Sequence, residues 1–249
     1  MRLSLIAIGT ACAALFLSWQ PSLAVAEGPK VLSEKSVTGF PFPESVAYDA
    51  AQKVLYVGQF VSALKPTEKD GKGRISKVSI DGKVLEQNYL PAAGGEALNK
   101  PKGIWVAGDR LWVTDIDVVW VFDTKTKKGR KVALPDVKFA NDPTVIGDVL
   151  YVSDNRGDAL YRVDPANFLD GAEPKVTKAF TDASINPNGL YPGKNNSVLM
   201  AGFKSNTEAR GIFVMTPGGK PKPMSRPIGR LDGLYLMADD SLLVTDWNS

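Results

Sequence analysis

Short stretches of alternating apolar and polar residues recur along the chain from residue 43 onward. Each is rich in β-branched and aromatic residues and is bounded by Gly, Asp, Asn or Pro, which is typical of β-strands separated by turns. Asp81-Gly82 and Gly218-Gly219 are good hairpin signals. Beyond the first 26 residues no segment has the periodicity of an amphipathic helix. The pattern therefore predicts an all-β fold.

Five segments share one layout, which is a turn-like start, a short apolar run, a turn and a strand of the form Leu-x-Val. The five starts are Pro43–Tyr48, Pro101–Val106, Ala140–Val145, Pro187–Tyr191 and Leu231–Leu236. The repeats follow one another at roughly 40 to 55 residues, and four short strands at that period are typical of a β-propeller. A β-sandwich is the alternative, but it does not explain why five starts look alike. We therefore predict a β-propeller with about five blades.

The last repeat stops at Thr245–Ser249, just after an inner strand. A sixth repeat would need about 45 more residues. In propellers an N-terminal strand often completes the last blade, and Val31-Leu32 and Ser36–Thr38 are candidates for it. We expect a six-bladed propeller truncated at its C-terminus, with the exposed sheet edges of an unclosed ring.

The N-terminus has the order of a secretory signal. Arg2 precedes an apolar run from Leu3 to Trp19, and Ala24-Val25-Ala26 supplies small residues for cleavage. An uncleaved anchor helix is the alternative, but a run of about 17 residues is at the short end of what spans a bilayer. We expect residues 1–26 to be removed and residues 27–249 to form a propeller domain, periplasmic or secreted, with no membrane attachment.

The charge balance bears on partners. Lys and Arg number 30 and Asp and Glu 27, a net charge of +3, whereas a nucleic-acid partner usually requires a dense basic face. The basic run Lys125–Lys131 stands alone and is interpreted as a solvated hairpin loop. Trp105, Trp112, Trp120 and Trp247 fall in strand patterns and predict packing between blades. We expect a monomer that binds a small-molecule substrate and no nucleic acid.

The chain contains no His, and its one Cys, Cys12, lies in the signal segment. The absence of His excludes His-based catalytic triads and His-ligated zinc sites. Any chemistry must depend on carboxylates, amides, Lys, Tyr, Ser, Thr or a hard metal ion.

When the starts of the five repeats are aligned, one column of the alignment holds residues that could bind a metal or a substrate. These column residues are Glu44, Lys102, Asn141, Asn188 and Asp232. Equivalent positions in a propeller face the central channel, so four oxygen-bearing side chains would converge there. Two carboxylates and two amides suit a hard cation, above all calcium. The alternative is that Asn-Asp, Asn-Gly and Asp-Gly are ordinary turn dipeptides. The ammonium of Lys102 would repel a cation unless it points away.

These motifs resemble those of the gluconolactonase and senescence marker protein (regucalcin) family of six-bladed propellers, both in their order along the chain and in their shared position within each repeat. The resemblance covers roughly residues 40 to 249. More distantly the chain is similar to paraoxonases and strictosidine-synthase-like propellers. The resemblance implies a divalent metal on Glu44, Asn141, Asn188 and Asp232, with Asp142 matching the acidic residue after the first Asn.

The chain departs from that family at two places. The gluconolactonase branch has Gly-Glu-Gly-Pro around its Glu, where this chain has Phe42–Ser45. It has a substrate-binding Arg two residues before the Asn of Asn-Asp, where this chain has Phe139. The paraoxonase branch relies on His, which is absent here. These departures weaken the case for a sugar lactone as the substrate.

The resemblance implies calcium-dependent hydrolysis of a lactone or related ester. Calcium would polarise the carbonyl, water would attack, and Asp232 would be both ligand and general base. Asp142, Phe139 and Lys102 are candidate substrate-binding residues. The alternative is a non-catalytic secreted propeller that binds a protein, peptide or small ligand, because propellers host many unrelated functions.

Overall fold

The computed structural model describes residues 33–204 and 208–247. The chain divides into two units, Met1–Lys35 and Ser36–Ser249, and the fold described below is that of the second. The expected signal segment, residues 1–26, lies outside the described residues. Within the described part of the chain, no helix has the length and apolar character needed to cross a bilayer.

The second unit consists of antiparallel sheets in which every strand pairs with its neighbour in sequence. Four sheets have four strands and one has two, and we call them blades 1 to 5. Blades 1 and 2 contain β1 (Pro43–Asp49), β2 (Val54–Gln59), β3 (Arg74–Ser79) and β4 (Val84–Leu90), then β5 (Pro101–Ala107), β6 (Arg110–Asp115), β7 (Val118–Asp123) and β8 (Gly129–Ala133).

The remaining three blades follow in chain order. They contain β9 (Ala140–Ile146), β10 (Val149–Asp154), β11 (Ala159–Asp164) and β12 (Lys175–Thr181), then β13 (Pro187–Pro192), β14 (Val198–Gly202), β15 (Ile212–Met215) and β16 (Lys222–Pro223), then β17 (Leu231–Leu236) and β18 (Leu242–Asp246). A short 3₁₀ turn, η1 (Lys194–Asn196), is the one helical element among the described residues.

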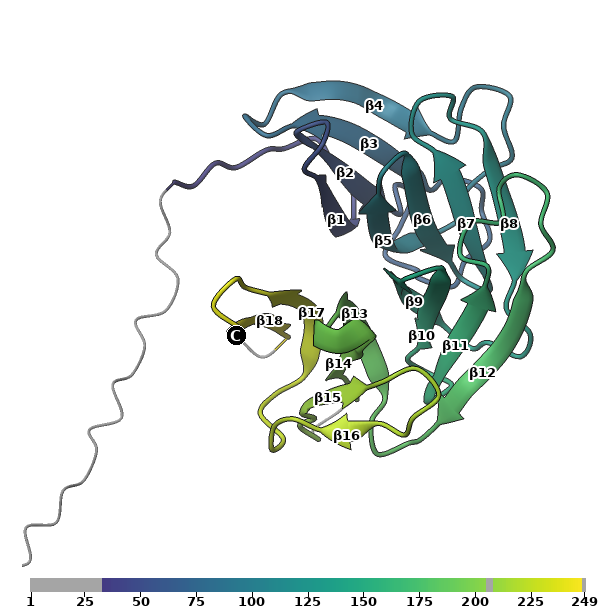
Figure 1. The fold of residues 1–249 in the computed structure, drawn as a ribbon. Coiled ribbons are helices and arrows are strands. Elements are labelled where there is room, and N and C mark those ends of the chain that lie inside the picture. Colours follow the sequence, from purple (N-terminus) through teal and green to yellow (C-terminus); the bar gives the residue numbers. More distant parts are fainter. Residues whose placement is uncertain (1–32, 205–207, 248–249) are drawn as a thin grey trace, which may run out of the picture. The chain divides into compact units, whose positions relative to one another are not determined.

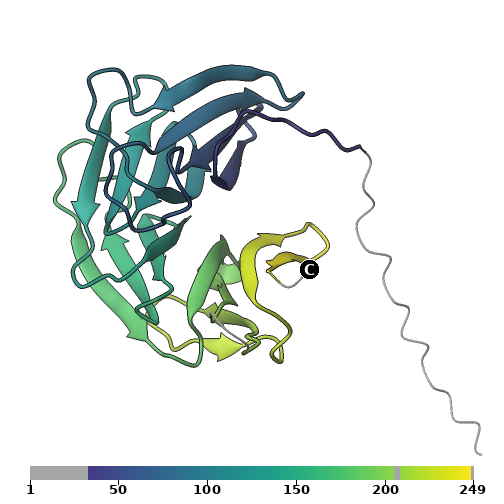
Figure 2. The same ribbon diagram turned by 180° about the vertical axis from the view of Figure 1, so that it is seen from behind.

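The first strands of successive blades, β1, β5, β9, β13 and β17, contact one another in that order. Figures 1 and 2 show the blades following one another around a common centre, with these five strands innermost. The prediction of an all-β propeller with about five blades is confirmed, and the β-sandwich alternative is wrong. Ser36–Thr38 forms no strand, and Val31-Leu32 lies outside the described residues.

Apolar packing between neighbouring blades forms the core. Four clusters of buried side chains lie at the four junctions from blade 1 to blade 5. Tyr56 and Trp120 belong to the first cluster and Trp112 and Tyr161 to the second. Full burial of one large apolar side chain contributes about 1.5–3 kcal/mol. Each blade is therefore held mainly by the faces of its neighbours.

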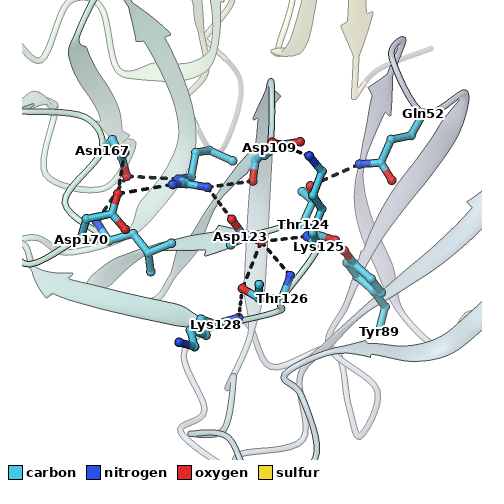
Figure 3. Close-up of polar contacts among 12 residues, drawn as sticks. Gln52, Tyr89, Asp109, Asp123, Thr124, Lys125, Thr126, Lys128, Asn167 and Asp170 are labelled. Carbon is cyan, nitrogen blue, oxygen red and sulfur yellow. Dashed lines mark hydrogen bonds and ion pairs between the residues drawn. The ribbon is translucent and has the colours of Figure 1, made fainter.

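Polar contacts add to this packing at blade 2 (Figure 3). Arg110 forms an ion pair with Asp123 at 2.6 Å and also donates to Asn167 of blade 3 at 3.3 Å. On the other side, Gln52 of blade 1 donates to the hydroxyl of Thr124 at 3.2 Å. The network therefore connects blade 2 to both neighbours.

The basic run is a turn only in its first half. Gly129–Lys131 begins β8, so the interpretation of the whole run as a hairpin loop is wrong there. Lys125 pairs with Asp109 at 2.8 Å, and Lys127 pairs with Glu86. These cations are thus balanced by nearby carboxylates.

Every inner strand carries one extra residue close to its beginning. In blade 4, for example, Pro187 pairs with Gly202 and Leu190 pairs with Met200, so three steps along β13 oppose two along β14. Such a β-bulge bends the strand and redirects its side chains. The bulges contain the five column residues, Glu44, Lys102, Asn141, Asn188 and Asp232.

The Asn-Asp, Asn-Gly and Asp-Gly pairs lie inside β9, β13 and β17, so their interpretation as ordinary turns is wrong. Gly189 has a different role. A Cβ atom added there would lie 1.9 Å from the carbonyl oxygen of Asp232. The absence of a side chain at Gly189 therefore lets β13 and β17 approach closely at the bulge.

Replacing Gly189 by Ala should lower the free energy of unfolding by about 3 kcal/mol, because the methyl group would meet backbone that cannot move aside. The matched control is Gly233→Ala, where the added Cβ would meet only the Thr245 hydroxyl at 3.4 Å. Urea unfolding of both variants tests this expectation. Equal losses at the two positions would contradict it.

Candidate functional site

A pocket of about 630 Å³ lies between the inner strands and is lined by residues of all five blades. Glu44, Asn141, Asp142 and Asp232 line its polar end. The other end is aromatic, with the Tyr191 ring 5.8 Å from that of Trp105 and 5.1 Å from that of Tyr235. The aromatic residues come three positions after the bulge residues of their strands, which is about 10 Å along a strand.

A chain of side-chain hydrogen bonds links blades 3, 4 and 5 at the polar end. The Asn141 amide donates to Oδ1 of Asn188, and Nδ2 of Asn188 donates to Oδ1 of Asp232 at 2.8 Å. Nδ2 of Asn188 also donates to the carbonyl of Leu231 at 3.0 Å. Nε1 of Trp247 donates to Oδ2 of Asp232 at 2.9 Å. Three of the four predicted ligands are therefore joined directly.

The indole donor of Trp247 was not expected from the sequence. Its strand pattern predicts packing between blades, but the residue is 63% exposed and contacts Asp232 and the ring of Phe203. The donors Trp247 and Asn188 lower the pKa of Asp232, but burial has the larger effect, and the pKa is raised above its usual value. Trp247 thus holds the carboxylate in place without making it more acidic than an ordinary Asp.

Asp142 points into the pocket beside this chain of hydrogen bonds. Its Oδ2 accepts from the backbone N–H of Leu190 at 2.7 Å. Burial raises the pKa of Asp142 to about 8, and the charge of Asp232 adds to the effect. A carboxyl group is thus held where its charged form is poorly compensated.

Glu44 faces the same pocket from β1 and remains exposed to solvent. Partial desolvation by the surrounding strands raises the pKa of Glu44, and the charges of Asp232 and Asp142 raise it further. The ammonium of Lys102 acts in the opposite direction. The charge of Glu44 therefore interacts with the carboxylates of blades 3 and 5 and with Lys102 of blade 2.

Lys102 is fully buried and does not line the pocket. Its Nζ donates to the carbonyl of Lys100 at 3.4 Å and lies 4.4 Å from the centre of the Phe139 ring. Burial lowers the pKa of Lys102, while the charges of Glu44 and Asp115 oppose that shift. The ammonium is thus an internal partial counter-charge for Glu44.

Phe139 is half-buried, comes just before β9, and does not line the pocket either. The structure thus brings Glu44, Asn141, Asp142 and Asp232 to one pocket and Asn188 into hydrogen-bond contact with two of them. Lys102 and Phe139 lie beside this group.

Hydroxyl groups support the bulges from behind. Oγ1 of Thr114 donates to the carbonyl of Asn141, and Oγ of Ser153 donates to the carbonyl of Asn188 at 2.6 Å. In blade 5, the N–H of Gly233 donates to Oγ1 of Thr245 at 2.7 Å. Sequence reasoning missed these residues.

A repeated dipeptide in the sequence could have identified them. A hydroxyl residue followed by Asp ends the second strand of blades 2, 3 and 5, as Thr114-Asp115, Ser153-Asp154 and Thr245-Asp246. The Asp of each pair accepts hydrogen bonds from the backbone just before the inner strand of its blade. For example, Asp154 accepts from the N–H groups of Lys138 at 2.9 Å and Phe139 at 2.8 Å. These pairs hold the main chain that carries the site.

The donor set fits a divalent cation in charge and in chemistry. Glu44, Asp142 and Asp232 with Lys102 have a formal charge of −2 when all four are ionised, and the two Asn residues add amide oxygens. Among residues 33–204 and 208–247, no three His, Cys, Asp or Glu side chains are grouped closely enough to hold a metal by themselves. A cation here would therefore depend on Asn141 and Asn188.

No protein-family model matches the sequence, and no curated protein matches it. Among solved structures, the nidogen/laminin complex aligns at 17% identity with a TM-score of 0.61, covering 83% of this chain and 72% of that chain. A gluconolactonase from Xanthomonas campestris aligns at 16% identity with a TM-score of 0.61, covering 82% and 69%.

Streptogramin B lyase aligns at 14% identity with a TM-score of 0.52, covering 83% of each chain. These neighbours are β-propellers with different activities and partners, and the likeness shows the fold alone. The chain is a β-propeller, and its function must be argued from its own residues.

The raised carboxyl pKa values predict that the metal-free protein loses stability as pH rises. Folded Asp142 holds its proton up to about pH 8, whereas unfolded Asp releases it near pH 4, so the folded state binds more protons between these limits. With EDTA present, the melting temperature should be higher at pH 5 than at pH 8. Asp142→Asn should reduce this difference, because the amide does not titrate.

The matched control is Asp148→Asn, which changes an exposed carboxylate in the turn between β9 and β10. Thermal melts followed by circular dichroism make the measurement. If both variants keep the wild-type difference in melting temperature between pH 5 and pH 8, Asp142 is not the group that causes it.

Proposed function

We propose that this chain is a calcium-dependent hydrolase of a lactone or a related ester, with the calcium ion held by Glu44, Asn141, Asn188 and Asp232. The observation that carries the proposal is the convergence of these side chains, from four blades, on one partly buried group whose negative charge Lys102 balances only in part. Asp142 and Asp232 are partly removed from water, and carboxylates in such places are rarely left unpaired, because removing their charge from water is costly. A divalent cation would balance the formal charge of the group.

Each residue has a distinct part in this proposal. Bound calcium would supply positive charge that polarises the ester carbonyl. Asp232 accepts the proton of the attacking water, and its raised pKa makes it a better base than an ordinary Asp. Asn188 and Trp247 orient its two oxygens. Glu44 and Asn141 complete the ligand set.

The aromatic end of the pocket bears on the substrate. Tyr48, Trp105, Tyr191 and Tyr235 give it an apolar wall with polar groups at the ring edges. Such a wall suits an acyl chain or ring attached to the reacting carbonyl. From the N-terminal segment alone, we propose that the reaction takes place in the periplasm or outside the cell.

Calcium should stabilise the mature protein. At about 100 times its dissociation constant, the ion should add about 2.7 kcal/mol, a rise of roughly 5–10 °C in melting temperature for a chain of this size. Thermal melts with EDTA and with excess calcium measure the effect. Asp232→Asn should abolish the rise, and the exposed control Asp148→Asn should retain it. A melt that calcium leaves unchanged would remove the metal from the proposal.

Kinetic measurements on a panel of lactones and 4-nitrophenyl esters separate ligand from base. Glu44→Gln should weaken calcium binding, and its activity should recover at saturating calcium. Asp232→Asn should remain about 10²–10⁴-fold slower at any calcium concentration, because it loses the base together with a calcium ligand. Calcium binding without turnover of any substrate would instead favour the non-catalytic propeller, with calcium in a structural role.

A further inference from the structure

Two cations lie against the ring of Phe139, which is beside the group of predicted ligands. Nζ of Lys102 is 4.4 Å from the ring centre, and the guanidinium carbon of Arg156 is 4.3 Å from it. Phe139 comes two residues before Asn141, so the ring lies at the beginning of the strand that carries a proposed ligand. One aromatic side chain thus connects the buried ammonium to an exposed guanidinium.

Arg156 is exposed and lies in the turn between β10 and β11, and that turn is well held. The N–H of Gly157 donates to Oδ1 of Asp154 at 3.0 Å, and the amide of Asn155 donates to the carbonyl of Phe203 at 3.0 Å. The guanidinium therefore projects from a fixed turn, and stacking on Phe139 reduces the side-chain freedom that binding would cost.

Within the described part of the chain, the Arg156 guanidinium makes no hydrogen bond or ion pair. Other arginines differ in this respect, since Arg74, Arg110, Arg130, Arg162 and Arg210 each donate to a carboxylate, an amide oxygen or a carbonyl. A planar guanidinium offers five donors in a fork that matches two oxygens of an anion. Its donors are therefore available to a ligand.

The charge of the surroundings favours an anionic ligand once the proposed cation is bound. The calcium ion and Lys102 together balance Glu44, Asp142 and Asp232, so the charge of Arg156 is left over. The charge of Arg156 also lowers the pKa of Lys102, which places the two cations within electrostatic reach of each other. An anion beside Arg156 would relieve that repulsion.

We infer that Arg156, held on the Phe139 ring, binds an oxyanion of the substrate, and that the hydrolase acts on esters or lactones bearing a free carboxylate or phosphate group. This inference rests on the proposed function and names its substrate class. Arg156 is a specificity-determining residue and takes no part in the chemical step. Phe139 holds the Arg156 guanidinium near Lys102, beside the group of predicted ligands.

The first test is binding in the presence of calcium, with succinate and methyl phosphate as charged probes and succinamide as the neutral control. Arg156→Gln should weaken the binding of at least one charged probe by about 10–100-fold, as expected for a hydrogen-bonded charge pair. It should leave succinamide binding unchanged. Arg156→Lys should recover part of the affinity, and Arg226→Gln, an exposed arginine in the loop before β17, should have no effect.

The preferred probe identifies the oxyanion as carboxylate or phosphate. Failure of the wild-type protein to bind either probe at millimolar concentration would overturn the inference. An equal effect of Arg156→Gln on charged and neutral probes would also overturn it. The melting temperature of Arg156→Gln should match that of the wild type, because the side chain is exposed.

A second test uses turnover of 4-nitrophenyl hydrogen succinate and of neutral 4-nitrophenyl butyrate. Arg156→Gln should raise KM for the charged ester about 10-fold or more and leave kcat and the neutral ester unaffected. Oxyanion binding that depends on Arg156 without any ester turnover would support the inference and count against the hydrolase. Turnover of both esters that Arg156→Gln leaves unchanged would support the hydrolase and overturn the inference.

Discussion

The site depends on one backbone feature, the β-bulge near the beginning of every inner strand. A regular strand would place alternate side chains on its two faces, so residues at this depth would pack into the blade junctions. The extra residue redirects the side chain at that point. Because the five inner strands follow one another around one centre, the bulges bring Glu44, Asn141, Asn188 and Asp232 together, with Lys102 buried beside them.

The bulges are secured by groups whose identity repeats from blade to blade. Thr114 and Ser153 bind the carbonyl groups of the next bulge, and Asp154 binds the N–H groups just before its own inner strand. Gly189 allows two bulges to come into backbone contact. A polar cluster on exposed loops would lack this rigidity. The precision of the site is therefore built into the sheets themselves.

The electrostatic consequence is a centre that concentrates negative charge. Desolvation raises the pKa values of Glu44, Asp142 and Asp232, the charge of Asp232 raises those of Glu44 and Asp142 further, and Lys102 compensates only part of the charge. Such a group costs folding free energy unless it gains a cation or keeps its protons. The proposed metal and the proposed anion at Arg156 act on the same balance of charge, because the charges of both Glu44 and Arg156 act on Lys102.

The all-β class, the repeat and the column containing Glu44, Asn141, Asn188 and Asp232 were determined by the sequence alone, because strand periodicity and turn residues are local properties. Only the tertiary structure decided that the Asn-Gly and Asp-Gly pairs lie in bulged strands, that Lys102 is buried beside the pocket, and that Trp247 and Arg156 belong to its surroundings. The physical reason is that each of these depends on contacts between blades, made by residues far apart in the chain.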